Sequence, residues 1–125
     1  MTEASTTDRV RVLVVDDSDD QADLLRRNFE RAGCEVVTVN TAERAITSYL
    51  ATTPDLVILD LQLPGMNGWQ LTSRIRVDRP ECAIAITSVL DAATYPLADA
   101  SLPKPFTGAQ VRQLLSDTVP RWAQP

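Results

Sequence analysis

Short apolar runs alternate with amphipathic segments along most of the chain. Runs rich in β-branched and aliphatic residues, bounded by turn residues, are typical of strands buried on both faces of a sheet. The last of these runs is the weakest, because it is short and contains proline. The strands predicted in this way cover Val10–Val15, Glu35–Val39, Asp55–Leu59, Cys82–Ile86 and Ser101–Pro103.

The segments between these runs carry apolar residues at helical spacing. They predict helices over Ser18–Ala32, over residues 42–50 behind a Thr41 cap, over Trp69–Val77 and over Thr107–Val119. Trp69, which opens the third helix, is either a partial core residue or a partner contact, and core packing is favoured. The residues expected to face the core are Ala22, Leu25, Phe29 and Ala32 in the first helix, Ala42, Ala45, Ile46, Tyr49 and Leu50 in the second, Leu71 and Ile75 in the third, and Val111, Leu114, Leu115 and Thr118 in the last.

Strands that alternate with helices predict one α/β domain with a doubly wound parallel sheet. We expect residues 9–119 to form this domain, residues 1–8 to be a flexible N-terminal tail, and residues 120–125 to be a C-terminal tail. In such sheets, functional sites form beyond the carboxyl ends of the strands. The residues that directly follow each strand are therefore the first to consider for chemistry.

Composition narrows the possible functions. The chain has 125 residues, a formal net charge of −5 and no histidine, so histidine-based catalysis and histidine metal ligands are excluded. It shows no basic stripe, no signal peptide and no apolar run long enough for a membrane span. These features predict a cytoplasmic protein without direct nucleic-acid or membrane contact. Cys34 and Cys82 stand alone and are expected to be buried free thiols, while Lys104 is the only lysine.

Polar residues follow four of the five predicted strands. These residues are Asp16 and Asp17, Asp60, Thr87, and Lys104. Taken singly, each has an ordinary explanation: the aspartates could cap a helix or a loop, Thr87 could be a strand residue, and Lys104 could lie on the surface. Together at one sheet edge, however, three carboxylates repel one another and need a cation.

Oxygen ligands without sulfur or imidazole favour Mg²⁺ as that cation. A hydroxyl and an ammonium beside it would form a pocket for a tetrahedral dianion. An ionised aspartate at such a metal is a competent nucleophile toward phosphorus, and the product is an acyl phosphate.

Four motifs in this order resemble the receiver domain of two-component response regulators. They are the residues 12–18, VLVVDDS, the residues 55–68, DLVILDLQLPGMNG, the residues 84–88, IAITS, and the residues 104–106, KPF. The resemblance covers residues 9 to about 119. It implies a flavodoxin-like fold, in which a five-stranded parallel sheet of order 2-1-3-4-5 is flanked by five helices.

The resemblance also implies a role for each residue that matches a family motif. Asp60 would accept a phosphoryl group from a phosphohistidine on a sensor histidine kinase or a histidine phosphotransfer protein. Mg²⁺ would be held by Asp17 directly, by Asp16 largely through water, by Asp60, and by the backbone carbonyl of Gln62. Thr87 and Lys104 would each contact a phosphoryl oxygen, and the peptide bond from Lys104 to Pro105 would be cis.

The chain departs from the family in the region that follows the fourth strand. Ser101 stands where the family usually has an aromatic residue, three positions before the lysine, and Pro103 lies inside the predicted fifth strand. Only 16 residues separate Thr87 from Lys104, fewer than is usual, and Pro96 is among them. We therefore expect the fourth helix of the family to be short, distorted or absent here.

The leading hypothesis is a stand-alone receiver that takes part in phosphorelay signalling through protein–protein contact and is not an enzyme on exogenous substrates. The alternative is a receiver-like adaptor that binds its partner independently of phosphorylation. A haloacid-dehalogenase-type phosphatase is disfavoured, because such enzymes have a second carboxylate two residues after the nucleophile and this chain has Gln62 there. A P-loop nucleotide enzyme is excluded by the lack of its glycine-lysine motif.

Overall fold

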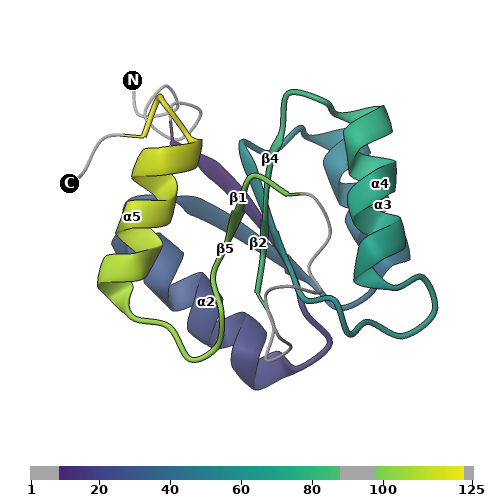
Figure 1. Cartoon of the computed structure of the whole chain (residues 1–125), viewed down its shortest axis with the longest axis horizontal. Coiled ribbons are helices and arrows are strands. Elements are labelled where there is room, and N and C mark those ends of the chain that lie inside the picture. Colours follow the sequence, from purple (N-terminus) through teal and green to yellow (C-terminus); the bar gives the residue numbers. More distant parts are fainter. Residues whose placement is uncertain (1–8, 88–97, 123–125) are drawn as a thin grey trace.

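The structure is a computed structural model that describes residues 9–87 and 98–122 (Figure 1). Within these residues, no helix is both long enough and apolar enough to cross a lipid bilayer. The predicted strands and the four helices are confirmed, with ends that shift by one or two residues. The elements in chain order are β1 (Arg11–Val15), α2 (Asp19–Arg31), β2 (Glu35–Val39), α3 (Ala42–Ala51), β3 (Leu56–Leu59), α4 (Gly68–Asp78), β4 (Ala83–Ile86), β5 (Ala100–Ser101) and α5 (Gly108–Thr118).

The five strands form one parallel sheet of order β2-β1-β3-β4-β5, which confirms the predicted fold class. Helices α2 and α5 cover one face, and α3 and α4 cover the other (Figure 1). The predicted irregularity of the fourth helix falls mainly on residues 88–97, which lie outside the described residues. The weak fifth strand is confirmed as an edge strand of only two residues, and Pro103 follows it without interrupting a ladder.

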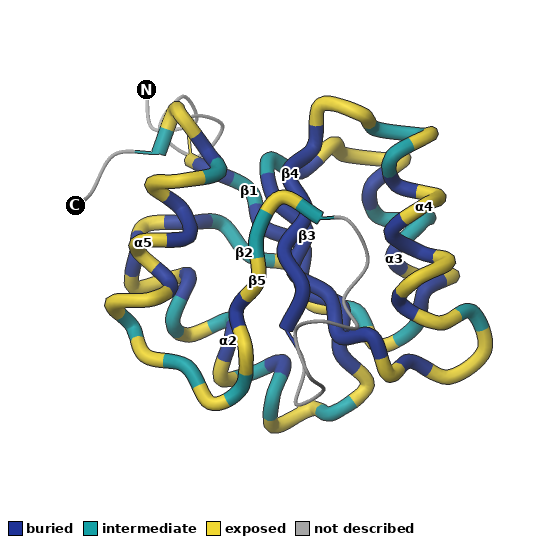
Figure 2. The backbone as a smooth tube through the Cα atoms, in the orientation of Figure 1, coloured by how far each residue is buried: buried dark blue, intermediate teal, exposed yellow. Residues whose placement is uncertain are grey.

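The sheet is buried on both of its faces, as the continuous apolar runs predict. Alternate residues of a strand point to opposite faces, so Val12 and Val14 pack with α2 and α5, whereas Leu13 and Val15 pack with α3 and α4. Figure 2 shows the central strands buried along their whole length.

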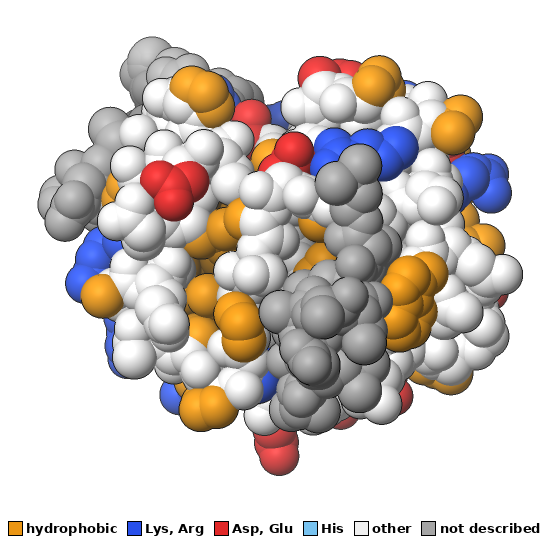
Figure 3. Space-filling view, viewed as in Figure 1, with side chains coloured by type: hydrophobic (Ala, Val, Ile, Leu, Met, Phe, Trp, Pro, Cys, Tyr) orange, Lys and Arg blue, Asp and Glu red, His pale blue; other side chains and the backbone are white. Residues whose placement is uncertain are grey.

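The α5 side of the core is covered less completely near β5. Ala100, in the two-residue strand β5, and Phe106, before α5, are only partly buried against the core. Figure 3 shows hydrophobic side chains in the space between α5 and β5.

Each helix begins at a polar cap that its own sequence provides. Ser18 accepts a hydrogen bond from Gln21 N at the start of α2, and Thr41 does the same for Arg44 N at the start of α3. Helices α4 and α5 begin with capping boxes, formed by Asn67 with Gln70 and by Thr107 with Gln110. Because Ser18 supplies the cap of α2, the alternative that Asp16 or Asp17 caps this helix does not hold.

Two apolar residues lie further outside the core than their sequence pattern predicts. Leu50 is 48% exposed and Trp69 is 37% exposed. Trp69 lies two positions before the buried Leu71, which places it on the opposite side of α4. Leu50 follows the buried Tyr49 by one position and is turned away from it by about 100° around α3. The prediction that Leu50 faces the core is therefore wrong.

Residues beyond α5 contact the body of the domain. The Arg121 guanidinium makes two hydrogen bonds to the Asp55 carboxylate, at 3.0 and 2.8 Å, and Trp122 Nε1 donates to Ala32 O at 2.8 Å. Partial burial acts to raise the pKa of Asp55, but hydrogen bonds from Arg121 and from Arg11 N outweigh it and hold the pKa below its usual value. The segment that the sequence marks as a tail is thus tied down at least to Trp122.

The two cysteines are free and buried, as predicted. Burial raises the pKa of each thiol to about 12, mainly because the apolar surroundings disfavour a thiolate. Both residues therefore behave as small apolar side chains at neutral pH.

Gly68, the first residue of α4, packs directly against the loop that follows β3. Its N–H donates to Leu61 O at 3.1 Å. A Cβ atom at this position would lie 2.5 Å from Leu61 Cα and 2.9 Å from Asp60 O, distances that real Cβ atoms do not show. Only glycine therefore allows α4 to begin so close to Asp60 and Leu61, the two residues that follow β3.

We expect Gly68→Ala to lower the free energy of unfolding by about 1–3 kcal/mol, the usual cost of overpacking. Gly108→Ala is a matched control, because Gly108 also opens a helix and a Cβ there would meet no atom nearer than 3.5 Å. The control should change the free energy of unfolding by less than about 0.5 kcal/mol. Urea denaturation followed by circular dichroism measures both, and equal stability of the two variants would contradict the account.

Candidate functional site

The register of the sheet places the ends of its strands in one row. Val15 is paired with Leu59, Leu59 with Ile86, and Ile86 with Ser101. Asp16, Asp60 and Thr87 directly follow the first three of these residues, so they lie side by side at the carboxyl edge. The chain after β5 remains attached to this edge, since Leu102 N donates to Ile86 O at 2.7 Å.

Lys104 contacts two of the aspartates that the sequence predicts for this edge. Its Nζ lies 3.1 Å from Asp16 Oδ2 and 2.9 Å from Asp60 Oδ2. The three side chains are nearly enclosed, with exposed fractions of 12% for Lys104, 1% for Asp16 and 10% for Asp60. Charge-assisted hydrogen bonds in such a site are stronger than exposed ion pairs.

The ammonium of Lys104 is held in its charged form. Burial acts to lower the pKa of Lys104, but the hydrogen bond to Asp60 and the charge of Asp16 outweigh burial, and the net shift is upward. Lys104 therefore presents a permanent positive charge at neutral pH.

The second oxygen of each carboxylate is fixed by the backbone of the following turn. Asp16 Oδ1 accepts from Ser18 N at 2.9 Å, and Asp60 Oδ1 accepts from Gln62 N at 2.9 Å. Both carboxylates are therefore held on one side by Lys104 and on the other by a local N–H, which leaves little rotational freedom.

Thr87 is fully buried at the end of β4. Among the described residues, its Oγ1 is the only buried side-chain nitrogen or oxygen that has no hydrogen-bond partner. An unpaired buried hydroxyl costs about 1–3 kcal/mol, and such groups in native structures call for an explanation. A hydroxyl in this state is available to donate to an oxygen of a ligand.

Asp17 and Gln62, which the sequence also predicts for the site, are both exposed. Asp17 directly follows Asp16, and Gln62 lies two positions after Asp60. No side-chain hydrogen bond or ion pair joins Asp17 or Gln62 to Lys104 or to the buried aspartates, although Gln62 N donates to Asp60 Oδ1. In the described part of the chain, no three Asp, Glu, His or Cys side chains gather closely enough to form a metal-binding group. The ammonium of Lys104 lies between Asp16 and Asp60 instead.

The donor chemistry of this edge fits Mg²⁺. Carboxylates and a backbone carbonyl are hard oxygen ligands, and Mg²⁺ takes one or two carboxylates and keeps several waters. The carboxylates of Asp16, Asp17 and Asp60 outnumber the single ammonium of Lys104 at this edge. A divalent cation would reduce this excess of negative charge. The exposure of Asp17 is compatible with a cation that retains part of its hydration.

Two positioning residues lie within the quoted family motifs: the resemblance implies that Gly68 shapes the loop beside the phosphate, and it assigns no role to Ser18. Ser18 fixes Asp16 through its backbone N–H and caps α2 with its side chain. Gly68 brings α4 against the backbone of Asp60 and Leu61. The capping preference of serine could have indicated the role of Ser18, whereas the reason why position 68 needs glycine, its close approach to the backbone of Leu61, depends on the packing of α4.

The structure describes two features of β5 and the segment after it that bear on the resemblance to the family. Ser101, in the position where an aromatic residue is usual, is exposed at the end of β5. The peptide bond between Lys104 and Pro105 is cis, as the resemblance implies.

Comparison with known proteins identifies the family. The family described as the response regulator receiver domain matches residues 12–116. The DNA-binding response regulator MtrA of Mycolicibacterium smegmatis is 34% identical over 105 residues, which cover 80% of this chain and 46% of MtrA. The chain thus spans about half the length of the curated relatives it matches.

Solved structures agree in fold. The response regulator TrrA of Thermotoga maritima, in complex with Mg²⁺ and BeF, is 26% identical with a TM-score of 0.81, over 88% of this chain and 99% of that chain. The signal receiver domain of an HD domain-containing protein of Pseudomonas fluorescens has a TM-score of 0.83 at 19% identity, over 91% and 89% of the two chains. The chain belongs to the response regulator receiver domains of two-component signalling systems.

Proposed function

We propose that Asp60 is the phosphoacceptor of this receiver and takes its phosphoryl group from a phosphohistidine on a histidine kinase or a histidine phosphotransfer protein. The contact of Lys104 Nζ with Asp60 Oδ2, at 2.9 Å, is the observation that carries this proposal. In the step, a carboxylate oxygen of Asp60 forms a bond to phosphorus while the bond from phosphorus to the imidazole nitrogen breaks. The imidazole leaves with the electron pair of that bond.

Lys104 and Thr87 would stabilise the transferred group through their charge and hydroxyl. Phosphoryl transfer depends mostly on positioning and on neutralising the charge of the phosphoryl oxygens. Lys104 supplies a fixed ammonium next to Asp60, and Thr87 Oγ1 is an unpaired donor at the end of the adjacent strand. Both groups are in place before any transfer, so little reorganisation is needed.

We propose that Asp16, Asp17, Asp60 and the Gln62 carbonyl hold Mg²⁺ for this step. When bound, Mg²⁺ would neutralise charge on the phosphoryl oxygens. The buried carboxylates of Asp16 and Asp60 are already fixed by Ser18 N and Gln62 N, so they would meet the ion with little loss of side-chain freedom. The solved TrrA relative contains Mg²⁺ and BeF, which supports the choice of ion.

The output of the phosphorylated receiver is proposed to be protein–protein contact in the cytoplasm, without enzymatic activity on exogenous substrates. The MtrA relatives are DNA-binding regulators about twice as long as the match to this chain. The absence of direct nucleic-acid or membrane contact therefore remains a prediction for these 125 residues.

The second candidate is a phosphate-independent adaptor, favoured by the exposed Ser101 at the position of the usual aromatic residue. The resemblance implies that the aromatic ring usually found at this position turns inward when the protein is phosphorylated. Serine has no ring that could make this movement. The two candidates differ in whether partner affinity changes on phosphorylation.

Incubation with Mg²⁺ and a small acyl-phosphate donor should add one phosphoryl group to the wild-type protein and none to Asp60→Asn. Intact-protein mass spectrometry measures the addition, and removal of Mg²⁺ with a chelator should prevent it. Asp99→Asn is a matched control, since Asp99 is an exposed aspartate away from the carboxyl edge. Normal phosphorylation of Asp60→Asn would refute the assignment. If the folded wild type accepts a phosphoryl group from neither this donor nor a phosphorylated histidine kinase, the adaptor is favoured.

Lys104→Arg should slow phosphorylation by at least about tenfold, equivalent to about 1.4 kcal/mol, although it preserves the charge. The planar guanidinium is larger than an ammonium, and Lys104 has little space between two buried carboxylates. Arg112→Lys provides the reverse exchange on the exposed face of α5 and should leave the rate unchanged. Time courses of mass addition measure the rates, and an unchanged rate for Lys104→Arg would show that the ammonium has no special role.

A further inference from the structure

A hollow of about 160 Å³ lies next to the candidate site, between the first turns of α2 and α3. Asp16 and Asp19 border it on the side of α2, and Arg44 borders it on the side of α3. The other lining residues are uncharged, namely Ala22, Thr38, Val39 and Asn40. The hollow thus places one cationic side chain across from two carboxylates, and one of these, Asp16, belongs to the candidate site.

The pairing of β1 with β2 brings the start of α3 to this place. Asp16 N donates at 3.1 Å to the carbonyl of Val39, the last residue of β2. Thr41 follows two positions later and caps α3, and Arg44 is the third residue of that helix. Main-chain contacts therefore hold Arg44 close to the candidate site.

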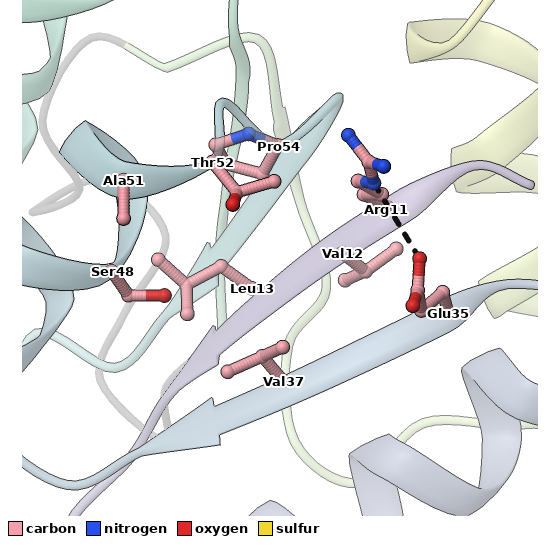
Figure 4. Close-up of a pocket in the computed structure, with 9 residues that line it drawn as sticks. All are labelled: Arg11, Val12, Leu13, Glu35, Val37, Ser48, Ala51, Thr52 and Pro54. Atoms are coloured by element: carbon pink, nitrogen blue, oxygen red, sulfur yellow. Dashed lines mark hydrogen bonds and ion pairs between the residues drawn. The ribbon is translucent and has the colours of Figure 1, made fainter. Parts of the chain in front are cut away.

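The charge of Arg44 has no close partner. None of the ion pairs in the part of the chain that the structure describes includes Arg44, which is exposed. It also stands in the first turn of α3, where the helix dipole disfavours a cation. A second hollow, of about 330 Å³ beside the first half of β2, differs in this respect, because its only charged side chains, Arg11 and Glu35, pair with each other at 3.4 Å (Figure 4). The positive charge of Arg44 therefore acts across its hollow on the carboxylates there.

We propose that Arg44 lowers the affinity of the carboxyl edge for Mg²⁺, an inference that rests on the magnesium site of the proposed function. Without the ion, the negative charges of Asp16 and Asp19 attract the guanidinium of Arg44. The same guanidinium repels a divalent cation held by Asp16, Asp17 and Asp60. Arg44 thus stabilises the metal-free edge relative to the loaded edge, and more Mg²⁺ is needed to fill the site.

Arg44 differs in this role from Lys104, the other cation at this edge. Lys104 Nζ donates hydrogen bonds to Asp16 and Asp60, so it also holds these carboxylates in place. Arg44 makes no side-chain bond to either aspartate, and its removal should change the local field without moving the ligands. A unit charge about 10 Å from a divalent ion in water alters the binding of that ion about fourfold before screening by salt.

Titration of the unphosphorylated chain with MgCl₂, followed by amide chemical shifts, measures this effect. Arg44→Gln should lower the Kd for Mg²⁺ by about two- to fourfold at an ionic strength of about 0.05 M, and Arg44→Glu should lower it by a similar factor again. Arg31→Gln is the matched control, because Arg31 is also exposed but ends α2, about 18 Å along the helix from Asp19. The control should change the Kd by less than about 1.5-fold. Circular dichroism establishes that the variants remain folded.

The salt dependence separates an effect of charge from a change in structure. At an ionic strength of about 1 M, where the Debye length is about 3 Å, the Kd values of the wild type and Arg44→Gln should converge. Equal Kd values of these two proteins at low salt, equal effects of Arg44→Gln and Arg31→Gln, or a difference that persists at high salt would overturn the inference and leave the magnesium site standing. A wild type whose signals at residues 60–62 do not respond to Mg²⁺ would contradict the magnesium site and this inference together.

Discussion

The ammonium of Lys104 lies between two carboxylates that are almost completely buried, and the arrangement of the carboxyl edge depends on this contact. Without that ammonium, Asp16 and Asp60 would face each other in a poorly solvated site as uncompensated charges. Breaking a buried ion pair typically costs about 3–5 kcal/mol. In the proposed function, Lys104 would attract a dianion and the aspartates would attract a divalent cation, since charges of both signs are already fixed at this edge. The proposed chemistry therefore uses the same three side chains that neutralise one another in the structure.

The alignment of the strands positions the side chains that make the contact between Lys104 and the two aspartates. The aligned ends of β1, β3 and β4 bring Asp16, Asp60 and Thr87 into one row, and Leu102 holds the following segment close enough for Lys104 to reach it. Sites on rigid elements are positioned better than sites on loops. The exposed members of the predicted site, Asp17 and Gln62, lie where a hydrated ion could reach them. The strands thus position the buried side chains, and the turns that follow the strands expose Asp17 and Gln62 to solvent.

Much of this site could be predicted from sequence because its signals are local. Continuous apolar runs locate the strands, and their alternation with helices implies the parallel order, so the sequence alone brings Asp16, Asp60 and Lys104 to one edge. Other features depend on tertiary packing and leave no such signal. Leu50 fits an apolar stripe but faces solvent, Gly68 resembles an ordinary turn glycine, and the anchoring of Arg121 and Trp122 requires partners many residues away.

We expect the transferred phosphoryl group to be attached to Asp60, the aspartate that follows β3 and that Lys104 contacts. Reduction of an acyl phosphate with borohydride converts the modified aspartate to homoserine and leaves free carboxylates unchanged, so tandem mass spectrometry of the digested protein can locate the group. After treatment with Mg²⁺ and a phosphodonor, we expect homoserine at position 60 alone. Homoserine at position 16 or 17, or phosphorylated protein without homoserine at position 60, would contradict it.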